Sequence, residues 1–515
     1  MRGRAKRAGR PDWKAIEALG IRRLAGHSGE VRPGDTFVAY PGALRDGRDY
    51  IAQAIEKGAD CVLWERDGFR WDPRWRVRNL GVADLRRYAG EIAARVYGRP
   101  SRRMWMVGVT GTDGKTTCGQ WIAQALSRTG RACAVVGTLG YGMRAPLKPL
   151  ANTTPDALWL QAQLAEFARR GAAAVSMEVS SIGLDQHRVA GVEFDVALFT
   201  NLSRDHLDYH RTMARYKEAK ARLFAWETLR AAVLNLDDDF GAELARRIRR
   251  RGLEVIGYGF GRRTGAQLAG ADLASDARGV RFDVRTPWGN ARVASPVLGR
   301  HNASNLLGTL GVLLASGVPL RKAVAALGRL KAVPGRLQRI GGGAKPLVVV
   351  DYAHTPDALE QALLTLRELL SSGLRTPGSG SDARVQRDRN SRLETRDSKL
   401  ICVFGCGGDR DRGKRPLMGR IAVRLADRVI VTSDNPRSED PRRIIEEIVG
   451  GMRAHEGERV IVADRRRAIR HALADARRGD IVLLAGKGHE DFQEISGVRH
   501  PFSDAAAARE ALATL

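Results

Sequence analysis

The chain has 515 residues, too many for one hydrophobic core, and at roughly 150 residues per domain it predicts about three domains. Its hydrophobic content of 43% is typical of a soluble α/β protein, and no stretch approaches the roughly 18 apolar residues of a membrane span. The net charge of +28 would suit a nucleic-acid-binding protein. However, only 13 of the 86 basic residues are lysines, the arginines are spread along the whole chain, and few aromatic residues accompany them. Nucleic-acid binding is therefore not expected.

The N-terminus and the cysteines predict a cytoplasmic location. The first 14 residues are basic, but no apolar stretch follows them as it would in a secretory signal. The five cysteines are odd in number and lie mostly in apolar runs, which is typical of buried thiols in a reducing compartment. Cys402 and Cys406 are four residues apart, but no second pair accompanies them as a zinc site would need.

The region from residue 21 to 99 alternates short strands with amphipathic helices and ends at a Gly-Arg-Pro sequence. No catalytic residue stands out in it. Ser28 and the loop 42–47 could bind a ligand, although exposed turn residues are the simpler interpretation of their spacing.

Residues 104–117, MWMVGVTGTDGKTT, predict a strand, a glycine-rich turn and the start of a helix. Lys115 supplies a fixed cation and Thr116 a hydroxyl suited to Mg²⁺. The helix predicted over 118–128 would place the positive end of its dipole on bound phosphates. Three glycines allow the backbone to turn tightly with its amides pointing inward, namely Gly108, Gly111 and Gly114.

The spacing differs from the strict pattern GxxxxGK[ST], because Val109 stands five positions before Gly114. An ordinary glycine turn that precedes a lysine is the alternative. The order of strand, turn and helix favours a site for a nucleoside triphosphate.

The central region continues to about residue 336 with near-continuous apolar strands separated by helices, which predicts a parallel sheet covered on both faces. Its strands are predicted at 132–138, 172–180, 194–202, 231–237 and 254–260. Ligands of such sheets bind at the carboxyl ends of the strands. Glu178 ends one strand, and the segment 203–210, SRDHLDYH, follows the next. A carboxylate and an imidazole there could share a metal with the phosphates, or both could be satisfied by ordinary hydrogen bonds.

Three further features complete the central region. Residues 216–224 have helical periodicity, and on spacing alone Lys217 and Lys220 are expected to be solvated. Residues 267–296 predict a hairpin, after which a helix is expected with its N-cap near Asn302. The Pro-Gly segment 333–340 is typical of an interdomain hinge.

The C-terminal region begins with a strand, a turn that contains Asp351 and His354, and a helix. Residues 371–399 have almost no apolar side chains and are expected to be a disordered insertion. Later strands again end in polar turns, and side chains of both charge signs fall there: Arg410, Asp434, Asn435, Arg437 and Glu490. Mixed fixed charges suit a zwitterionic ligand, and a solvated salt-bridge network is the alternative.

Eleven motifs in this order resemble those of the Mur ligase family. They are GVTGTDGKTT, NTTPDAL, EVSSIGLDQHRV, FTNLSRDHLDYH, YKEAKARLF, LGRHN, PGR, VDYAHTPDAL, GCGGDRDRGKRPLM, DNPRSEDP and GKGHEDF. The resemblance implies three α/β domains: a UDP-substrate-binding domain at 1–100, a P-loop-type ATP-binding domain at 101–337, and a Rossmann-like amino-acid-binding domain at 338–515. The insertion 371–399 would lie in the third.

The resemblance also implies an ATP-dependent, ADP-forming reaction with Mg²⁺ as cofactor. A carboxylate of UDP-N-acetylmuramoyl-L-alanyl-D-glutamate would become an acyl phosphate, which the amine of meso-diaminopimelate would attack. Fixed cations and magnesium are then the expected catalysts. The family's ATP contacts fall here on Gly111, Thr112, Asp113, Gly114, Lys115, Thr116, Thr117, Asn302, Arg336 and Asp351.

The family's metal residues fall on Thr116, Glu178, His206 and Lys220. Lys220 matches a lysine that is carbamylated, which requires a neutral and hence desolvated amine. Lys115, Glu178, His206, Lys220 and Arg336 are thereby implied to be catalytic.

The two other substrates are also assigned by the resemblance. Contacts to the UDP-linked substrate fall on Ser28, Asn152, Thr153, Thr154, Ser180, Gln186 and Arg188. Contacts to diaminopimelate fall on Arg410, Asp434, Asn435, Pro436, Arg437, Gly486 and Glu490. The DNPR string favours diaminopimelate over the alternatives, which are L-lysine or, in the next ligase of the series, D-alanyl-D-alanine. Outside the family, a P-loop ATPase acting on nucleic acid is the remaining alternative. A monomer is expected.

The chain departs from the family pattern at four places. Asp113 stands where Asn is expected, and Ile182 replaces a His. The sequence HSGEV at 27–31 replaces the usual DSR pattern, and the insertion 371–399 is longer than the family needs.

Overall fold

The computed structural model describes residues 10–42, 45–261, 265–276, 278–371, 398–452 and 458–515. The chain forms two compact units. The first contains the N-terminal part up to Thr110 together with Leu126–Leu198 and Glu218–Ala232. The second contains Gly111–Ala125, Phe199–Lys217 and the chain from Val233 onward. The prediction for residues 371–399 falls almost entirely on residues outside the described ranges.

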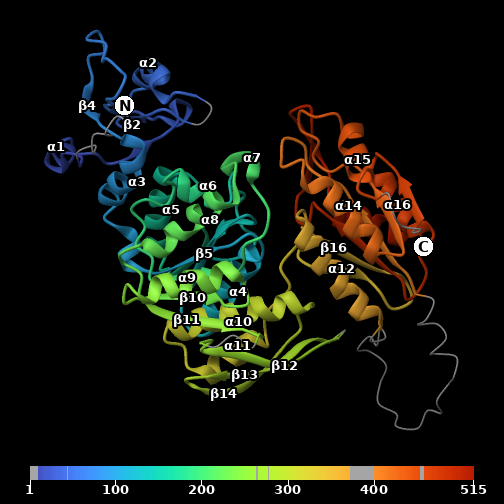
Figure 1. The fold of residues 1–515 in the computed structure, drawn as a ribbon. Helices are drawn as coiled ribbons and strands as arrows, with labels where there is room; N and C mark the ends of the chain where they lie inside the picture. The colour runs from blue at the N-terminus through green and yellow to red at the C-terminus, as the bar shows by residue number, and fades with distance from the viewer. Residues whose placement is uncertain (1–9, 43–44, 262–264, 277, 372–397, 453–457) are drawn as a thin grey trace, which may run out of the picture. The chain divides into compact units, whose positions relative to one another are not determined.

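The N-terminal part forms a four-stranded parallel sheet in the order β1-β2-β3-β4. Its strands are β1 (Leu24–Ala25), β2 (Thr36–Ala39), β3 (Cys61–Glu65) and β4 (Arg78–Val82). Its helices are α1 (Trp13–Ala18), η1 (Ser28–Glu30), η2 (Gly47–Tyr50), α2 (Ile51–Glu56) and α3 (Leu85–Val96), and η3 (Pro100–Arg103) follows. Figure 1 shows this part of the chain in blue. Ser28 is buried here, so it is not an exposed turn residue.

The central part forms a ten-stranded sheet in the order β14-β13-β12-β11-β10-β9-β5-β8-β6-β7. The strands are β5 (Trp105–Thr110), β6 (Cys133–Gly137), β7 (Gly140–Gly142), β8 (Ala174–Glu178), β9 (Val196–Phe199), β10 (Ala231–Asn235), β11 (Glu254–Gly259), β12 (Leu268–Asp276), β13 (Gly279–Thr286) and β14 (Gly289–Ser295). β5 and β6 both pair with β8 in parallel, whereas β12, β13 and β14 are antiparallel, as the predicted hairpin requires. Almost every residue of β5, β6, β8, β9 and β10 is buried, which explains their continuous apolar sequences.

Helices connect these strands. They are α4 (Lys115–Arg128), α5 (Ala157–Arg169), α6 (Ser181–Asp185), α7 (Leu207–His210), α8 (Met213–Ala221), η4 (Arg222–Ala225), α9 (Asp239–Arg249), α10 (Arg300–Ala315) and α11 (Leu320–Leu327). α4 begins directly at Lys115, three residues earlier than the sequence predicts, because Gly114 already turns the chain with φ +80°.

The predicted N-cap near Asn302 is wrong. α10 begins at Arg300, and its N-cap is Gly299, which has φ +93°. Asn302 lies inside the first turn, where its side-chain amide donates to the Leu298 carbonyl at 2.7 Å. Glycine adopts a positive φ without strain, so the chain turns at Gly299 and the asparagine is left for another role.

The C-terminal part forms a six-stranded sheet in the order β15-β16-β20-β17-β18-β19, parallel except where β15 joins β16. Its strands are β15 (Gln338–Gly341), β16 (Leu347–Asp351), β17 (Leu400–Phe404), β18 (Arg428–Val431), β19 (Glu458–Ile461) and β20 (Ile481–Ala485), and β21 (Phe492–Ile495) pairs with β22 (Val498–Pro501). The helices are α12 (Pro356–Ser371), α14 (Lys414–Leu425), α15 (Pro441–Val449), α16 (Arg465–Ala474) and α17 (Asp504–Ala513).

Both faces of this sheet are packed with apolar side chains. Alternate strand residues such as Val349 and Leu483 pack with α12, α14 and α15, whereas Val348 and Val482 pack with α16 and α17. These helices appear in orange and red around β16 in Figure 1. The arrangement is the doubly covered parallel sheet that the alternating pattern predicts.

All five cysteines are buried, as the sequence predicts, and none forms a disulfide. Burial raises the pKa of Cys133, Cys402 and Cys406 to about 12, so these thiols are not nucleophiles at neutral pH. Within the described ranges, no helix is long and apolar enough to cross a membrane.

Candidate active site

The glycine-rich turn after β5 is built so that side chains are excluded from two of its positions. A Cβ on Gly111 would overlap the hydroxyl oxygen of Thr200, and a Cβ on Gly114 would lie 2.6 Å from Asn305 Oδ1. Lys115 folds its ammonium onto the turn and donates to the carbonyls of Gly111 at 3.0 Å and Thr112 at 2.6 Å. A turn of this shape, with a lysine over it at the start of a helix, can hold phosphate.

The segment after β9 holds the turn in place through hydrogen bonds on both sides of Asp113. The Thr200 hydroxyl donates to the Asp113 carbonyl at 2.6 Å, and the Asp113 amide donates to Asn201 Oδ1 at 2.9 Å. The carboxylate of Asp113 accepts from the Ser203 hydroxyl at 3.3 Å. Asp113, which stands where the family pattern has Asn, therefore places a negative charge beside the turn, and a neutral hydroxyl donates a hydrogen bond to it.

Arg336 joins the Pro-Gly segment to the phosphate loop. Its guanidinium donates to the hydroxyl of Thr116 at 3.1 Å and lies 4.3 Å over the ring of Tyr352. Asp351 accepts a hydrogen bond from the Leu337 amide at 2.7 Å, and burial raises the pKa of its carboxyl. Three residues that the sequence predicts to contact ATP therefore lie at the Pro-Gly segment: Thr116, Arg336 and Asp351.

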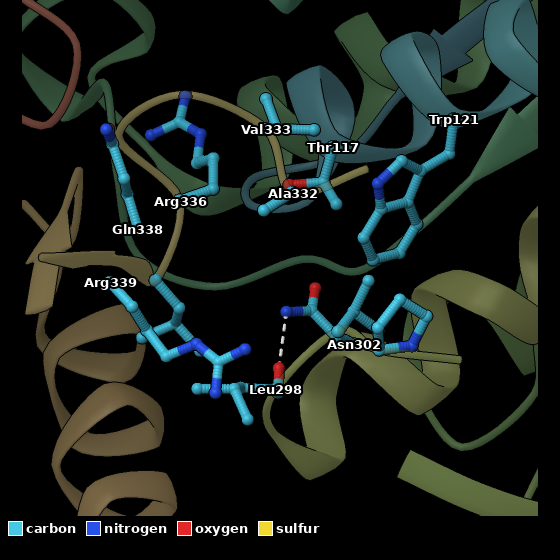
Figure 2. A pocket seen from close by; sticks show the side chains of 12 residues that line it. Thr117, Trp121, Leu298, Asn302, Ala332, Val333, Arg336, Gln338 and Arg339 are labelled. Carbon is cyan, nitrogen blue, oxygen red and sulfur yellow. Dashed lines mark hydrogen bonds between the residues drawn. The ribbon is translucent and has the colours of Figure 1, made fainter. Parts of the chain in front are cut away.

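A cavity of about 200 Å³ lies beside this arginine. Figure 2 shows that Asn302 and the indole of Trp121 border it, with Arg336 and Arg339 on the other side. Its other lining residues are Thr117, Pro296, Val297, Leu298, Ala332, Val333, Leu337 and Gln338. An aromatic ring, apolar side chains and two side-chain amides, those of Asn302 and Gln338, make a suitable environment for a planar heterocycle.

Glu178 lies at the carboxyl end of β8 and is 3% exposed. Its carboxylate accepts two hydrogen bonds from Thr138, from the amide at 2.8 Å and from the hydroxyl at 3.0 Å. Gly137 leaves room for it, since a Cβ there would overlap Glu178 Oε1. The two hydrogen bonds from Thr138 hold this carboxylate in one orientation.

Five of the seven candidate residues for the UDP-linked substrate form one network with Glu178, namely Thr153, Thr154, Ser180, Gln186 and Arg188. Thr154 donates to the Glu178 carbonyl at 3.0 Å and contacts the Ser180 hydroxyl at 3.1 Å. Arg188 donates to the Thr154 carbonyl at 2.9 Å and holds Gln186 at 2.7 Å. Thr153 contacts Thr138 at 3.1 Å, and Asn152 is exposed beside it. Ser28 lies apart from this network, in η1 of the N-terminal part, where it donates to Gln53 Oε1 at 2.6 Å.

Lys220 is not the solvated residue that its spacing predicts, since it is 1% exposed. Lys217, on the same helix α8, forms an ion pair with Glu243 at the surface. Burial disfavours the charged form of an amine, so the desolvation that the resemblance implies for Lys220 is present.

Next to His206, the structure reveals a cluster that the sequence did not predict. The buried carboxylate of Asp205 lies 3.4 Å from His206 Nε2, 3.7 Å from His354 Nε2 and 3.8 Å from Lys414 Nζ. Burial acts to raise the pKa of Asp205, but the His354 hydrogen bond and the His206 and Lys414 charges outweigh it and hold the pKa well below its usual range. His354 and Lys414 lie 149 and 209 positions after Asp205 in the sequence, so no local spacing could reveal their contact with it.

A second polar site lies at the carboxyl ends of β18 and β20. Asn435 donates to Glu490 at 2.7 Å and accepts from Lys487 at 2.9 Å. Lys487 also lies 3.1 Å from Glu490 and 3.8 Å from Asp434. Burial and the Asp434 charge raise the pKa of the Glu490 carboxyl. Lys487 was not among the predicted contacts of this site, although its place in the GKGHEDF motif was a signal.

The other predicted residues of this site lie around it. Arg437 has φ +52°, and its guanidinium donates to the Gly408 carbonyl at 2.7 Å. Arg410 is exposed and donates to the carbonyl of Asp409. Pro436 precedes Arg437, and a Cβ on Gly486 would overlap Asp434 Oδ2. The structure therefore brings together carboxylates, an amide and cations, as a zwitterionic ligand would need.

Among the described residues, no group of three or more His, Cys, Asp or Glu side chains could hold a metal ion by itself. Mg²⁺ sites usually take one or two carboxylates and complete their shell with waters and substrate phosphates. The hydroxyl of Thr116 and the oriented carboxylate of Glu178 are oxygen donors of that kind.

Three domain models of one family match the chain. They describe the Mur ligase family catalytic domain at residues 21–97, the Mur ligase middle domain at 109–313, and the Mur ligase glutamate ligase domain at 389–488. The chain belongs to the Mur ligase family.

Related proteins match this Mur ligase over nearly its whole length. A UDP-N-acetylmuramoyl-L-alanyl-D-glutamate--2,6-diaminopimelate ligase of Nitrosomonas europaea is 48% identical over 96% of this chain and 93% of its own length. That of Chromobacterium violaceum is 49% identical over 98% and 97%. A solved structure of a ligase with the same name is 37% identical, covers 96% of this chain and 95% of its own, and has a TM-score of 0.66. The three-domain α/β architecture of the family is thereby confirmed.

Proposed function

We propose that this Mur ligase joins meso-diaminopimelate to UDP-N-acetylmuramoyl-L-alanyl-D-glutamate with conversion of ATP to ADP and phosphate. Relatives at 48% and 49% identity carry the name of this activity, and they match the chain almost end to end. The polar site around Asn435 and Glu490 is the observation that favours a zwitterionic acceptor. The reaction belongs to the synthesis of peptidoglycan precursors, in the cytoplasm.

ATP binds with its phosphates on the turn Gly111–Thr117. Lys115 leaves the loop carbonyls and contacts the β- and γ-phosphate oxygens, while the amides of the turn donate to the same anion. The cavity beside Asn302 and Trp121 receives the adenine. At about 200 Å³ it is smaller than the roughly 300 to 1,000 Å³ of drug-sized sites, so one ring system fits there. A solved Mur ligase of Thermotoga maritima with ADP, 19% identical, shares the fold.

Thr116, Glu178, His206 and Lys220 would hold Mg²⁺. A bound Mg²⁺ would supply neutralisation of the phosphate charge during phosphoryl transfer to a carboxylate. The buried amine of Lys220 combines with carbon dioxide and loses a proton, and the resulting carbamate supplies two anionic oxygens in place of an ammonium. Thr138 keeps the Glu178 carboxylate in a fixed orientation.

The reaction takes place in two steps. The side-chain carboxylate of the D-glutamate residue attacks the γ-phosphorus of ATP, and ADP leaves. The neutral amine of diaminopimelate then attacks the acyl phosphate carbon, and phosphate leaves as the amide forms. Lys115 and Arg336 stabilise the charge that develops on the phosphoryl oxygens, and no covalent enzyme intermediate is needed.

The network Thr154, Ser180, Gln186 and Arg188, together with Asn152, Thr153 and Ser28, positions the UDP-linked substrate. Because Thr154 hydrogen bonds to the Glu178 backbone, the substrate site and the metal residue share one framework.

The acceptor binds in the C-terminal part. Arg437 and Arg410 bind the carboxylates of diaminopimelate. Asp434 and Glu490 bind its distal ammonium, so each charged group of the ligand meets side chains of the opposite charge. L-Lysine lacks the second carboxylate, so it would leave one arginine without a partner. The domains are 1–100, 101–337 and 338–515, and the enzyme acts as a monomer.

Phosphate release tests this proposal. We expect release only when ATP, Mg²⁺, the UDP-linked substrate and diaminopimelate are all present, and loss of the signal when any one is omitted. Release that continues without an amine acceptor, or that depends on DNA, would contradict it.

A further inference from the structure

Two consecutive residues of the loop after β9 form ion pairs with two residues near the start of α14. Arg204 binds the Asp411 carboxylate with both ends of its guanidinium, at 2.8 Å from Nε and 3.2 Å from Nη2. The next residue, Asp205, lies 3.8 Å from Lys414 Nζ. The charges alternate over residues 409–412, so a shift of one residue would place Arg204 against Arg410 or Arg412. The two pairs therefore fix one alignment of the segments.

The Arg204–Asp411 pair is shaped by its surroundings. The side chain of Asp411 is 8% exposed, and it also accepts from the Gly413 amide at 3.0 Å. A Cβ on Gly413 would lie 2.5 Å from Arg204 Nη2. The guanidinium therefore occupies space that a side chain at position 413 would otherwise fill. Gly413 has an ordinary helical φ of −62°, and no backbone strain requires a glycine there. The hydrogen bond to Arg204 lowers the pKa of Asp411, in keeping with a direct charge contact.

The segment 409–414 is also fixed at its other end. Asp409 accepts from the Ser438 hydroxyl at 2.7 Å and amide at 3.1 Å, directly after the DNPR string. The segment thus connects the proposed acceptor site to the loop that carries His206. Arg410, a proposed acceptor contact, lies between these two attachments.

We propose that the Arg204–Asp411 pair is a positioning device for acceptor binding, an inference that rests on the proposed ligase function. It holds the segment 409–414 so that Arg410 meets the acceptor where the activated carboxylate is attacked. Arg204 and Asp411 touch no substrate themselves. They act through Arg410, and ATP binding does not depend on them.

The kinetic consequence is a selective one. Arg204→Ala and Asp411→Ala should each raise the apparent KM for diaminopimelate about tenfold, while the KM for ATP changes by less than about twofold. Arg466→Ala is the matched control, because Arg466 is similarly exposed and forms an ion pair with Glu510 at the surface. It should leave both KM values unchanged.

Gly413→Ala distinguishes a positioning role in acceptor binding from an effect on the overall stability of the protein. The added methyl displaces the guanidinium, so the variant should show a similar rise in the diaminopimelate KM with an unchanged or higher Tm. In an Arg204→Ala background, the same substitution should add nothing. The charge reversal Arg204→Asp with Asp411→Arg should recover part of the loss of either single reversal.

The experiment is steady-state phosphate release with varied diaminopimelate and varied ATP, on the wild type and these variants, with Tm measured in parallel. Equal effects on both substrates, or additive effects of Gly413→Ala and Arg204→Ala, would overturn the proposal. Failure of the wild type to turn over with diaminopimelate would instead refute the ligase function itself, so the two failures are distinguishable.

Discussion

The phosphate loop and the proposed acceptor site both follow parallel strands, but they are built from different parts of the chain. At the loop, the important groups belong to the backbone, and glycines at 111 and 114 admit no Cβ. At the acceptor site, polar and charged side chains already contact one another: Lys487 donates to the Asn435 amide oxygen and forms an ion pair with Glu490. A loop of backbone amides suits any phosphate, whereas paired side chains discriminate among ligands.

This difference predicts how each site fails. A substitution in the phosphate loop should abolish catalysis with every acceptor. A substitution in the acceptor site should alter the affinity for the acceptor and leave the KM for ATP unchanged.

The largest effect is expected at Lys220. Lys220→Ala removes the buried amine that becomes the carbamate, and kcat should fall by about 1,000-fold or more. Lys217→Ala, on the same helix but at the surface, is the matched control and should keep kcat within about twofold. Phosphate release measures both, and a short carboxylic acid in the medium should restore part of the Lys220→Ala activity.

Two outcomes would contradict the carbamate. One is wild-type turnover by Lys220→Ala. The other is an intact mass of the native protein that never includes an added carbon dioxide, even at raised bicarbonate.

Gly111→Ala should come next. Its Cβ would overlap the Thr200 hydroxyl, and the resulting displacement of the loop should lower kcat/KM for ATP by about 100-fold. Gly130→Ala is the control, because Gly130 also has a positive φ of +93° but no atom lies within 4 Å of the new Cβ. It should lower the free energy of unfolding by about 1 kcal/mol and leave turnover unchanged. Equal losses of kcat/KM for ATP in Gly111→Ala and Gly130→Ala would show that backbone strain, and not the overlap with Thr200, causes the loss.

Arg437→Ala tests the other side of the comparison. Loss of a charged contact to a carboxylate should raise the KM for diaminopimelate by about 10- to 50-fold and leave the KM for ATP nearly unchanged. Arg442→Ala, an exposed arginine five residues later, is the control. Michaelis constants for both substrates measure the effect, and a parallel rise in both for Arg437→Ala would point to a folding defect.

The smallest effect concerns stability. Burial lowers the pKa of His301, at the start of α10, to about 4, below the roughly 6.5 of an unfolded histidine. Between these values the unfolded chain binds more protons than the folded one, so the free energy of unfolding should fall as the pH falls from about 6.5 to 4. Urea unfolding of the wild type and His301→Gln across this range should show a shallower decline for the variant. Parallel curves would contradict the assignment.

Local patterns predicted most of the fold. The strand, turn and helix around Lys115 could be read because glycine positions and apolar runs are local features. The N-cap at Gly299 was missed because Asn302 is the stronger capping residue by type, while a positive φ at the glycine decided the geometry.

What the sequence could not show are contacts between distant segments. Spacing on α8 places Lys220 among exposed lysines, and only packing of the helix buries it. The Asp205 cluster depends on two loops and the start of α14, so nothing in the spacing of residues near 205, 354 or 414 predicts it.

The most direct test is a competition with the wild-type enzyme. ATP, Mg²⁺ and UDP-N-acetylmuramoyl-L-alanyl-D-glutamate are mixed with equal concentrations of meso-diaminopimelate, L-lysine and D-alanyl-D-alanine, and the product masses are determined. We predict that nearly all product carries diaminopimelate. Product with lysine in comparable amount would contradict the assignment of the acceptor site, and no product with any acceptor would contradict the ligase function.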